Sequence, residues 1–181
     1  MENKEGLEGL VALCATGNTD VFREIFDELE RPLFRYIRIR TKSRDDALDI
    51  MQDTFVDLWN SLEKGRFVFT SIEEFYGFVY TIARRKVAKL YRFTRPTVSL
   101  EDVSDLLPDE EGSVKEETIL LFDSLTKLGD VDREIIRLRY LSGLRFSEIA
   151  VLLKKEEITV KVRHHRAIQK LRKILGYEEE K

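Results

Sequence analysis

The sequence is poor in the residues that interrupt helices. It has three prolines and nine glycines among 181 residues. We also find no run of alternating apolar and polar residues bounded by turn residues, which is the pattern of a half-buried strand. Leu, Ile, Glu, Lys and Arg are frequent instead. Because these residues are favourable or tolerated in helices, we expect an all-α fold.

Several functional features are missing as well. The single cysteine, Cys14, excludes an internal disulfide framework and fits a reducing cytoplasm. No apolar stretch approaches the ~20 residues of a membrane span, and the N-terminal MENKEGLEGL does not resemble a secretion signal. We recognise no glycine-rich phosphate loop, no metal-ligand cluster and no paired-carboxylate pocket. The sequence therefore predicts a cytoplasmic protein that is not an enzyme and needs no cofactor or metal.

The net charge of −3 conceals a segregation of charge along the chain. Basic residues cluster in 84–95 and 161–173, and acidic residues dominate the stretch between them. Residues 93–112 also contain two prolines and follow no helical pattern. We therefore predict two small helical domains, 1–92 and 113–181, joined by a flexible acidic linker at 93–112. Two basic surfaces on a tether favour two separate contacts with a polyanion.

The C-terminal segment has the pattern of a helix-turn-helix within a domain of four helices. A short helix is predicted from Ser147, a candidate N-cap, to about Leu153, and a longer one from 156 or 159 to 175. The longer helix has an apolar stripe, and basic residues without an acid cover its outer face. This arrangement is typical of a second helix that lies in the DNA major groove. A solvated surface helix is the alternative.

A second charged helix is predicted from about 44 to 62. The face opposite its apolar stripe is acidic, and Asp53 and Asp57 lie too far from the helix start to be explained by the helix dipole. This face therefore indicates a docking surface for a basic partner, with a solvated face as the alternative. The surface consists of Asp45, Asp46, Asp49, Gln52, Asp53, Val56 and Asp57.

A loop and the helix that follows it carry a third set of candidates. In the loop 61–71, Lys64 and Arg66 alternate with Phe67 and Phe69, and such a mixture can stack on unpaired bases. Packing of the two phenylalanines against the core is the alternative. The next helix, 72–91, ends in a basic block, and its tyrosines at 76 and 80 are expected to point away from the centre of its apolar stripe.

Three motifs give the chain a resemblance to bacterial RNA polymerase sigma factors of the sigma-70 family, in the small extracytoplasmic-function group. ALDIMQDTF (47–55) is similar to the acidic helix of that family. FYGFVYTIARR (75–85) resembles the segment that melts and reads the minus-ten element. LRYLSGL (138–144), EIA (148–150) and TVKVRHHRA (159–167) resemble the reader of the minus-thirty-five element. The motifs occur in the order of the family and flank the predicted linker.

The resemblance implies a promoter-specificity subunit that binds core RNA polymerase, recognises both promoter elements and promotes DNA melting. It implies a monomer that docks on the beta-prime clamp helices and the beta flap, and an anti-sigma factor as a further partner. The acidic surface above would contact polymerase. The implied minus-ten and melting residues are Lys64, Arg66, Phe67, Phe69, Tyr76, Tyr80, Arg84, Arg85 and Lys89. The implied minus-thirty-five residues are Thr159, Lys161, Val162, Arg163, His165, Arg166 and Lys170.

Two other functions remain open at this point. A stand-alone helix-turn-helix regulator would bind duplex DNA without polymerase, although such proteins usually dimerise and we find no heptad seam here. A sigma-like interaction module that has lost promoter reading is the second. It is suggested by the turn, where Lys154, Lys155 and Ile158 replace the usual glycine, apolar residue and glycine of the family.

Overall fold

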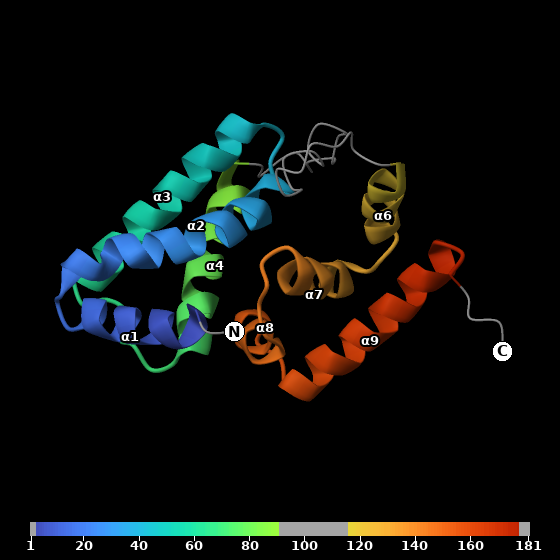
Figure 1. Ribbon diagram of the computed structural model, residues 1–181. Coiled ribbons are helices and arrows are strands. Elements are labelled where there is room, and N and C mark those ends of the chain that lie inside the picture. The colour runs from blue at the N-terminus through green and yellow to red at the C-terminus, as the bar shows by residue number, and fades with distance from the viewer. Residues whose placement is uncertain (1–2, 91–115, 178–181) are drawn as a thin grey trace.

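The computed structural model describes residues 3–90 and 116–177, and the regular elements in these ranges are helices. The prediction of an all-α fold is confirmed. The predicted linker, 93–112, and both domain boundaries beside it lie outside the described residues. Figure 1 shows α1 to α4 as one group and α6 to α9 as a second. The elements are α1 (Asn3–Ala15), the 3-10 helix η1 (Thr19–Val21), α2 (Phe22–Arg38), α3 (Arg44–Glu63), α4 (Ile72–Leu90), α6 (Glu116–Thr126), α7 (Asp130–Tyr140), α8 (Phe146–Leu153) and α9 (Glu157–Ile174).

Local contacts fix where the functional helices begin. Ser43 caps α3, since its hydroxyl accepts a hydrogen bond from the Asp46 N–H at 3.0 Å. The prediction that Ser147 caps α8 is wrong, because the helix begins one residue earlier, at Phe146. The N–H of Arg145 instead donates to Glu148 Oε2 at 2.6 Å. Among the residues described, no helix is long and apolar enough to cross a membrane.

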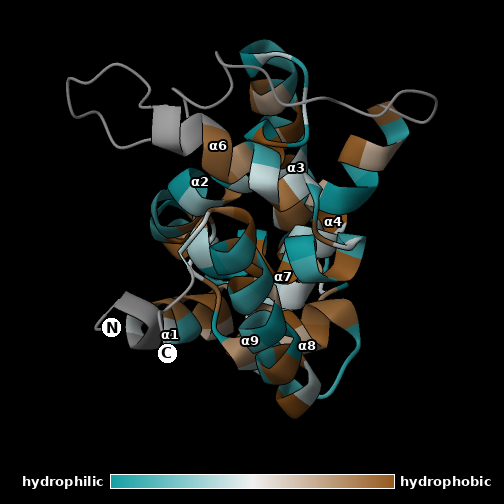
Figure 2. Cartoon of the chain, turned by 90° about the vertical axis from the view of Figure 1, so that its right-hand side faces the viewer, coloured by the Kyte–Doolittle hydropathy of each residue, from teal (hydrophilic) through white to brown (hydrophobic). Residues whose placement is uncertain are grey.

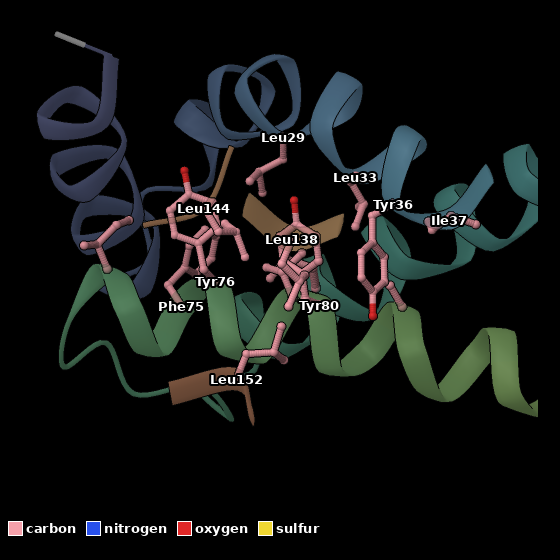
Figure 3. Packing of buried hydrophobic residues seen from close by; sticks show 14 of the residues in the cluster. Leu29, Leu33, Tyr36, Ile37, Phe75, Tyr76, Tyr80, Leu138, Leu144 and Leu152 are labelled. Carbon is pink, nitrogen blue, oxygen red and sulfur yellow. The ribbon is translucent and has the colours of Figure 1, made fainter. Parts of the chain in front are cut away.

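The two groups of helices share one hydrophobic core. Figure 3 shows Leu29 and Tyr36 of α2, Tyr80 of α4, Leu138 of α7 and Leu152 of α8 in the same cluster. Among the described helices, α4 and α8 form the most extensive contact, and they belong to different groups. A smaller cluster joins the end of α2 to α6, α7 and α9. The N-terminal half, with α1 to α4, and the C-terminal half, with α6 to α9, are therefore packed against each other in this structure.

Polar groups also connect the two halves. The Tyr36 hydroxyl donates to Glu134 Oε1 of α7 at 3.1 Å, and the guanidinium of Arg40 forms an ion pair with the same carboxylate. Burial raises the pKa of the Tyr36 hydroxyl, so it is protonated and able to donate. Near this pair, burial and then the charge of Arg40 lower the pKa of Arg137 to about 10. Glu134 therefore lies among polar and cationic groups from both halves.

A glycine lies where α4 and α8 cross. A Cβ placed on Gly77 would lie 3.2 Å from Val151 Cγ1 and 3.8 Å from the Leu152 nitrogen. The absence of a side chain at Gly77 thus allows the two helices to approach closely. Beside this crossing, Ser147 Oγ donates to Glu73 Oε1 at 3.3 Å.

Candidate docking and nucleic-acid interfaces

The acidic surface of α3 is on the outside of the chain. Asp45, Asp49, Gln52, Asp53 and Asp57 are exposed, and Asp46 is half-buried. Val56 lies among them with 56% of its surface exposed. The opposite side of α3 packs into the core through residues such as Ala47, Met51, Phe55 and Leu58. The predicted carboxylates therefore form one continuous surface with an apolar residue within it.

A lysine on α4 pairs with this surface, a contact that no local sequence pattern predicts. Lys86 Nζ lies 2.7 Å from Asp57 Oδ2 and 3.5 Å from Asp53 Oδ2. Lys86 and Lys89 also border a hollow of about 380 Å³ between α3 and α4, together with Asp49 and Asp53. Lys89, which was predicted to contact the minus-ten DNA, is thus placed beside the acidic surface. A basic partner that docks on α3 would compete with Lys86 for the carboxylates.

The loop before α4 is partly packed and partly exposed. The Phe67 ring lies 4.9 Å from the ring of Phe78 and 5.9 Å from that of Phe75, measured between ring centroids. Phe69 also packs against the core, so both rings follow the alternative of core packing. Lys64 and Arg66 remain exposed. The basic side chains of this loop are therefore available to a polyanion, while its aromatic rings are half-buried.

The tyrosines of α4 are not where the helical pattern placed them. We expected Tyr76 and Tyr80 to point away from the centre of the apolar stripe and to be available to DNA, and this expectation is wrong, because both are buried. The reason is the C-terminal half: Leu138 of α7, Leu144 of the following loop and Leu152 of α8 share one buried cluster with these tyrosines (Figure 3). Arg84 and Arg85, one to two turns further along, are exposed. In this conformation, the basic end of α4 is exposed and its two tyrosines are not.

The C-terminal half contains the predicted helix-turn-helix in α8 and α9. The turn begins at Lys154, whose φ of 53° and ψ of 52° are left-handed. The N–H of Lys155 donates to the Ala150 oxygen at 2.9 Å, which is the closing bond of a Schellman turn. Lysine thus adopts the conformation that a glycine normally supplies. The unusual turn residues leave the geometry of the motif intact.

We expect Lys154→Gly to stabilise the protein. A non-glycine residue in the left-handed region costs roughly 1–2 kcal/mol. Glycine removes this cost but loses more entropy on folding, so we expect a net increase of about 0.5–1 kcal/mol in the free energy of unfolding, measured by urea denaturation. Lys155→Gly is the matched control, because Lys154 is the one non-glycine residue with positive φ among the residues described. A stability gain in the control of equal size would contradict the explanation.

The outer face of α9 carries the predicted DNA-contacting residues. Thr159, Lys161, Val162, His165, Arg166 and Lys170 are exposed, and Arg163 is partly exposed. Figure 2 views the chain from the side on which α6 and α9 lie in Figure 1. The opposite side of the helix packs through Val160, Ala167 and Leu171. The structure therefore places all seven residues on one helix, away from the contact between the two halves.

Neighbouring carboxylates orient two of these basic groups. Arg163 Nη1 lies 2.8 Å from Asp132 Oδ1 of α7, and Lys161 pairs with Glu157 at 2.7 Å. The second pair spans four residues of one helix and follows from sequence spacing. The Asp132 pair does not, because it joins two helices whose packing no local pattern specifies. Asp132, Lys86 and Glu134 are the functional candidates that the sequence did not reveal.

Two family models match this chain, one in its N-terminal half and one in its C-terminal half. Residues 25–97 match the family described as Sigma-70 region 2, and residues 124–173 match Sigma-70, region 4. The first match includes α3 and α4, and the second includes α7 to α9.

Individual relatives are similar over most of the chain. The chain is 28% identical over 173 residues to the ECF RNA polymerase sigma factor BldN of Streptomyces coelicolor, covering 92% of this chain and 64% of that protein. It is 28% identical to the RNA polymerase sigma factor CnrH of Cupriavidus metallidurans, covering 95% of both chains.

Two solved structures have a similar fold. CnrH in complex with the cytosolic domain of CnrY gives a TM-score of 0.65 with 26% identity, covering 95% of this chain and 98% of that one. The sigma factor RpoE of Bartonella quintana, in complex with the anti-sigma factor NepR, gives a TM-score of 0.61, covering 88% and 99% of the two chains. At 22% identity, the second likeness supports the fold alone.

Proposed function

The chain belongs to the sigma-70 family of RNA polymerase sigma factors, in its extracytoplasmic-function group, and from this premise we propose that it directs core RNA polymerase to promoters by reading their minus-thirty-five and minus-ten elements and promoting DNA melting. Its role in this proposal is to supply specificity, while the chemistry belongs to polymerase. The observation that supports the proposal best is the separation of an acidic and a basic surface. The acidic one lies on α3 and the basic one on α9, in different halves of the chain.

In this proposal the acidic surface of α3 binds polymerase. Carboxylates on an exposed helix attract a basic partner and exclude DNA, whose phosphates they would repel. Val56 adds an apolar contact that a solvated face does not need. We propose the beta-prime clamp helices as the surface that docks on Asp49, Gln52 and Asp53, with the beta flap as a contact of the C-terminal half.

The DNA contacts are divided between the two halves. We propose that α9 enters the major groove of the upstream element, with Arg166 and its neighbours on phosphates and base edges. The exposed Lys64, Arg66, Arg84 and Arg85 bind the backbone of the minus-ten region. Tyr76 and Tyr80 contact its bases only after α8 has moved. The functional domains proposed are 1–92 and 113–181, with 93–112 between them.

The proposal extends to partners and location. A structure of the related CnrH contains the cytosolic domain of CnrY, and one of RpoE contains the anti-sigma factor NepR. We propose that an anti-sigma factor likewise binds this chain, and that the chain acts as a monomer in the cytoplasm, where polymerase and promoters are. Lys154 keeps the turn geometry of a helix-turn-helix, and this supports promoter reading over the alternative of an interaction module that has lost it.

Transcription in vitro tests the proposed function. The purified chain is added to bacterial core RNA polymerase and a genomic DNA library, and the 5′ ends of the transcripts are sequenced. We expect initiation at a defined set of sites that share two sequence elements, and none above background without the chain. If the chain selects duplex DNA equally well without polymerase and adds no start sites, a stand-alone regulator is the correct reading.

We expect Arg166→Ala to weaken binding of promoter duplex to the polymerase complex by roughly 1–2 kcal/mol. Arg166 is exposed on α9, and loss of one phosphate contact should also reduce the slope of log affinity against log salt by about one. Titration of a labelled duplex at several salt concentrations measures both quantities. Arg23→Ala, at an exposed arginine of α2, is the control. Equal affinity and salt slope in Arg166→Ala would place the groove contact elsewhere.

A further inference from the structure

Two exposed aliphatic residues mark the start of α9. Ile158 is 64% exposed and Val162, one turn later, is 43% exposed. Single exposed apolar residues are common on protein surfaces. Two β-branched residues that are neighbours on an exposed helix face are less readily explained, because they favour helices less than lysine, glutamate or arginine would. The stability of α9 therefore gives no reason for the pair.

The pair lines a hollow with a charged rim. The hollow has a volume of about 380 Å³ and is bordered by Asp132, Ile158, Thr159, Val162, Arg163 and Arg166. Arg163 is held against Asp132 at 2.8 Å, so its guanidinium lies to one side of the aliphatic pair. Arg166 lies one turn beyond Val162. Cationic groups around an apolar patch suit a ligand that combines negative charge with a small apolar group.

A thymine in the DNA major groove has this combination. Of the four bases, thymine alone presents a methyl group there, and aliphatic or methyl side chains are its usual contacts. The phosphates beside it would meet Arg163 and Arg166. In helix-turn-helix proteins, the first residues of the reading helix are those that reach base edges. Ile158 and Val162 occupy that part of α9.

We propose that Ile158 and Val162 determine specificity by contacting the 5-methyl group of a thymine in the upstream promoter element. This inference rests on the proposed function of α9 as the reader of that element. Asp132 has a positioning role: it holds Arg163 aside, so that the aliphatic pair faces the base. The contact distinguishes thymine from cytosine at that position.

Replacing thymine by deoxyuridine tests the proposal, because it removes the methyl group and leaves every hydrogen-bonding group in place. The full-length chain is assembled with core RNA polymerase and bound to a promoter recovered from the genomic library. Each thymine of the upstream element, on either strand, is then replaced in turn. We expect one or two replacements to weaken binding by about three- to tenfold, the size expected for one buried methyl group.

Protein variants then locate the contact. In the double variant Ile158→Ala with Val162→Ala, we expect the thymine and deoxyuridine promoters to bind equally. The matched control truncates two other exposed aliphatic residues of the same half, Leu120→Ala with Leu121→Ala, and should keep the discrimination. Circular dichroism and the urea midpoint verify that both double variants are folded.

The outcomes separate this inference from the function on which it rests. If a promoter is selected but its upstream element has no thymine, or every deoxyuridine promoter binds as the original does, the inference is overturned and the proposed function remains. The inference is also overturned if Ile158→Ala with Val162→Ala retains the discrimination. If the chain neither assembles with polymerase nor selects promoters, the proposed function fails, and the inference with it.

Discussion

Replacing Asp49 and Asp53 together by lysine is expected to abolish association with core RNA polymerase. Both side chains are exposed near the middle of the acidic surface, so the change places two positive charges where a basic partner docks. Like charges at a docking surface cost several kcal/mol, and we expect at least a 100-fold loss of affinity. Co-purification with core enzyme and a fluorescence titration of complex formation measure the effect.

The fold should survive this change. Neither aspartate lies in the first turn of α3, so the N-terminal cap and dipole interactions remain. Asp53 is 72% exposed, and its contact with Lys86 is longer than that of Asp57, which keeps the pairing with Lys86. The control Glu24→Lys with Glu30→Lys changes the net charge equally at two exposed sites on α2. Wild-type affinity in the Asp49 and Asp53 variant would leave the acidic face as a solvated surface.

The sequence predicted those features that depend on local pattern. The apolar stripes of α3 and α9 determine which side of each helix is buried, so Asp49 and Arg166 were correctly predicted to face outward. The turn between α8 and α9 was predicted although its residues are unusual for the family. The reason is that the apolar pattern stops at Lys154 and resumes on the next helix.

Contacts between distant segments were beyond reach of the sequence. The helical period placed Tyr76 and Tyr80 at the edge of one stripe, and α4 in fact has a second buried side that faces α8. A second buried side is visible only when the partner helix is known. Glu134 illustrates the same limit: its partners Tyr36 and Arg40 are 98 and 94 residues away in the chain.

The burial of the α4 tyrosines has a consequence for the order of events at a promoter. In the structure, α8 lies on the side of α4 that the proposed function assigns to the minus-ten bases, whereas the reading face of α9 is exposed. Both DNA contacts cannot form in this closed arrangement. If the proposed sites are correct, the two halves must separate before melting, and a protein that cannot separate should bind the upstream element alone.

A disulfide between α4 and α8 is expected to lock the closed arrangement and stop transcription. In Gly77→Cys with Val151→Cys, the two new thiols lie at the crossing of α4 and α8. A Cβ at position 77 is 3.2 Å from Val151 Cγ1, and this separation is within the reach of a disulfide. The natural Cys14 is buried in α1, and burial raises the pKa of its thiol, so it does not compete for oxidation. We expect the oxidised protein to lose at least tenfold in promoter melting, measured by permanganate reactivity of unpaired thymines. Addition of a reductant should restore melting.

Binding to an upstream-element duplex distinguishes locking from damage. Because the reading face of α9 lies away from the α4–α8 contact, the oxidised protein should bind this duplex as the reduced protein does. The single variant Gly77→Cys controls for crowding at the helix crossing. Gly9→Cys controls for a new thiol at a helical glycine that has nothing within 4 Å of its Cβ position. Melting by the oxidised protein at the rate of the reduced one would show that α4 meets the minus-ten bases without releasing α8, and the tyrosines would then have no part in reading them.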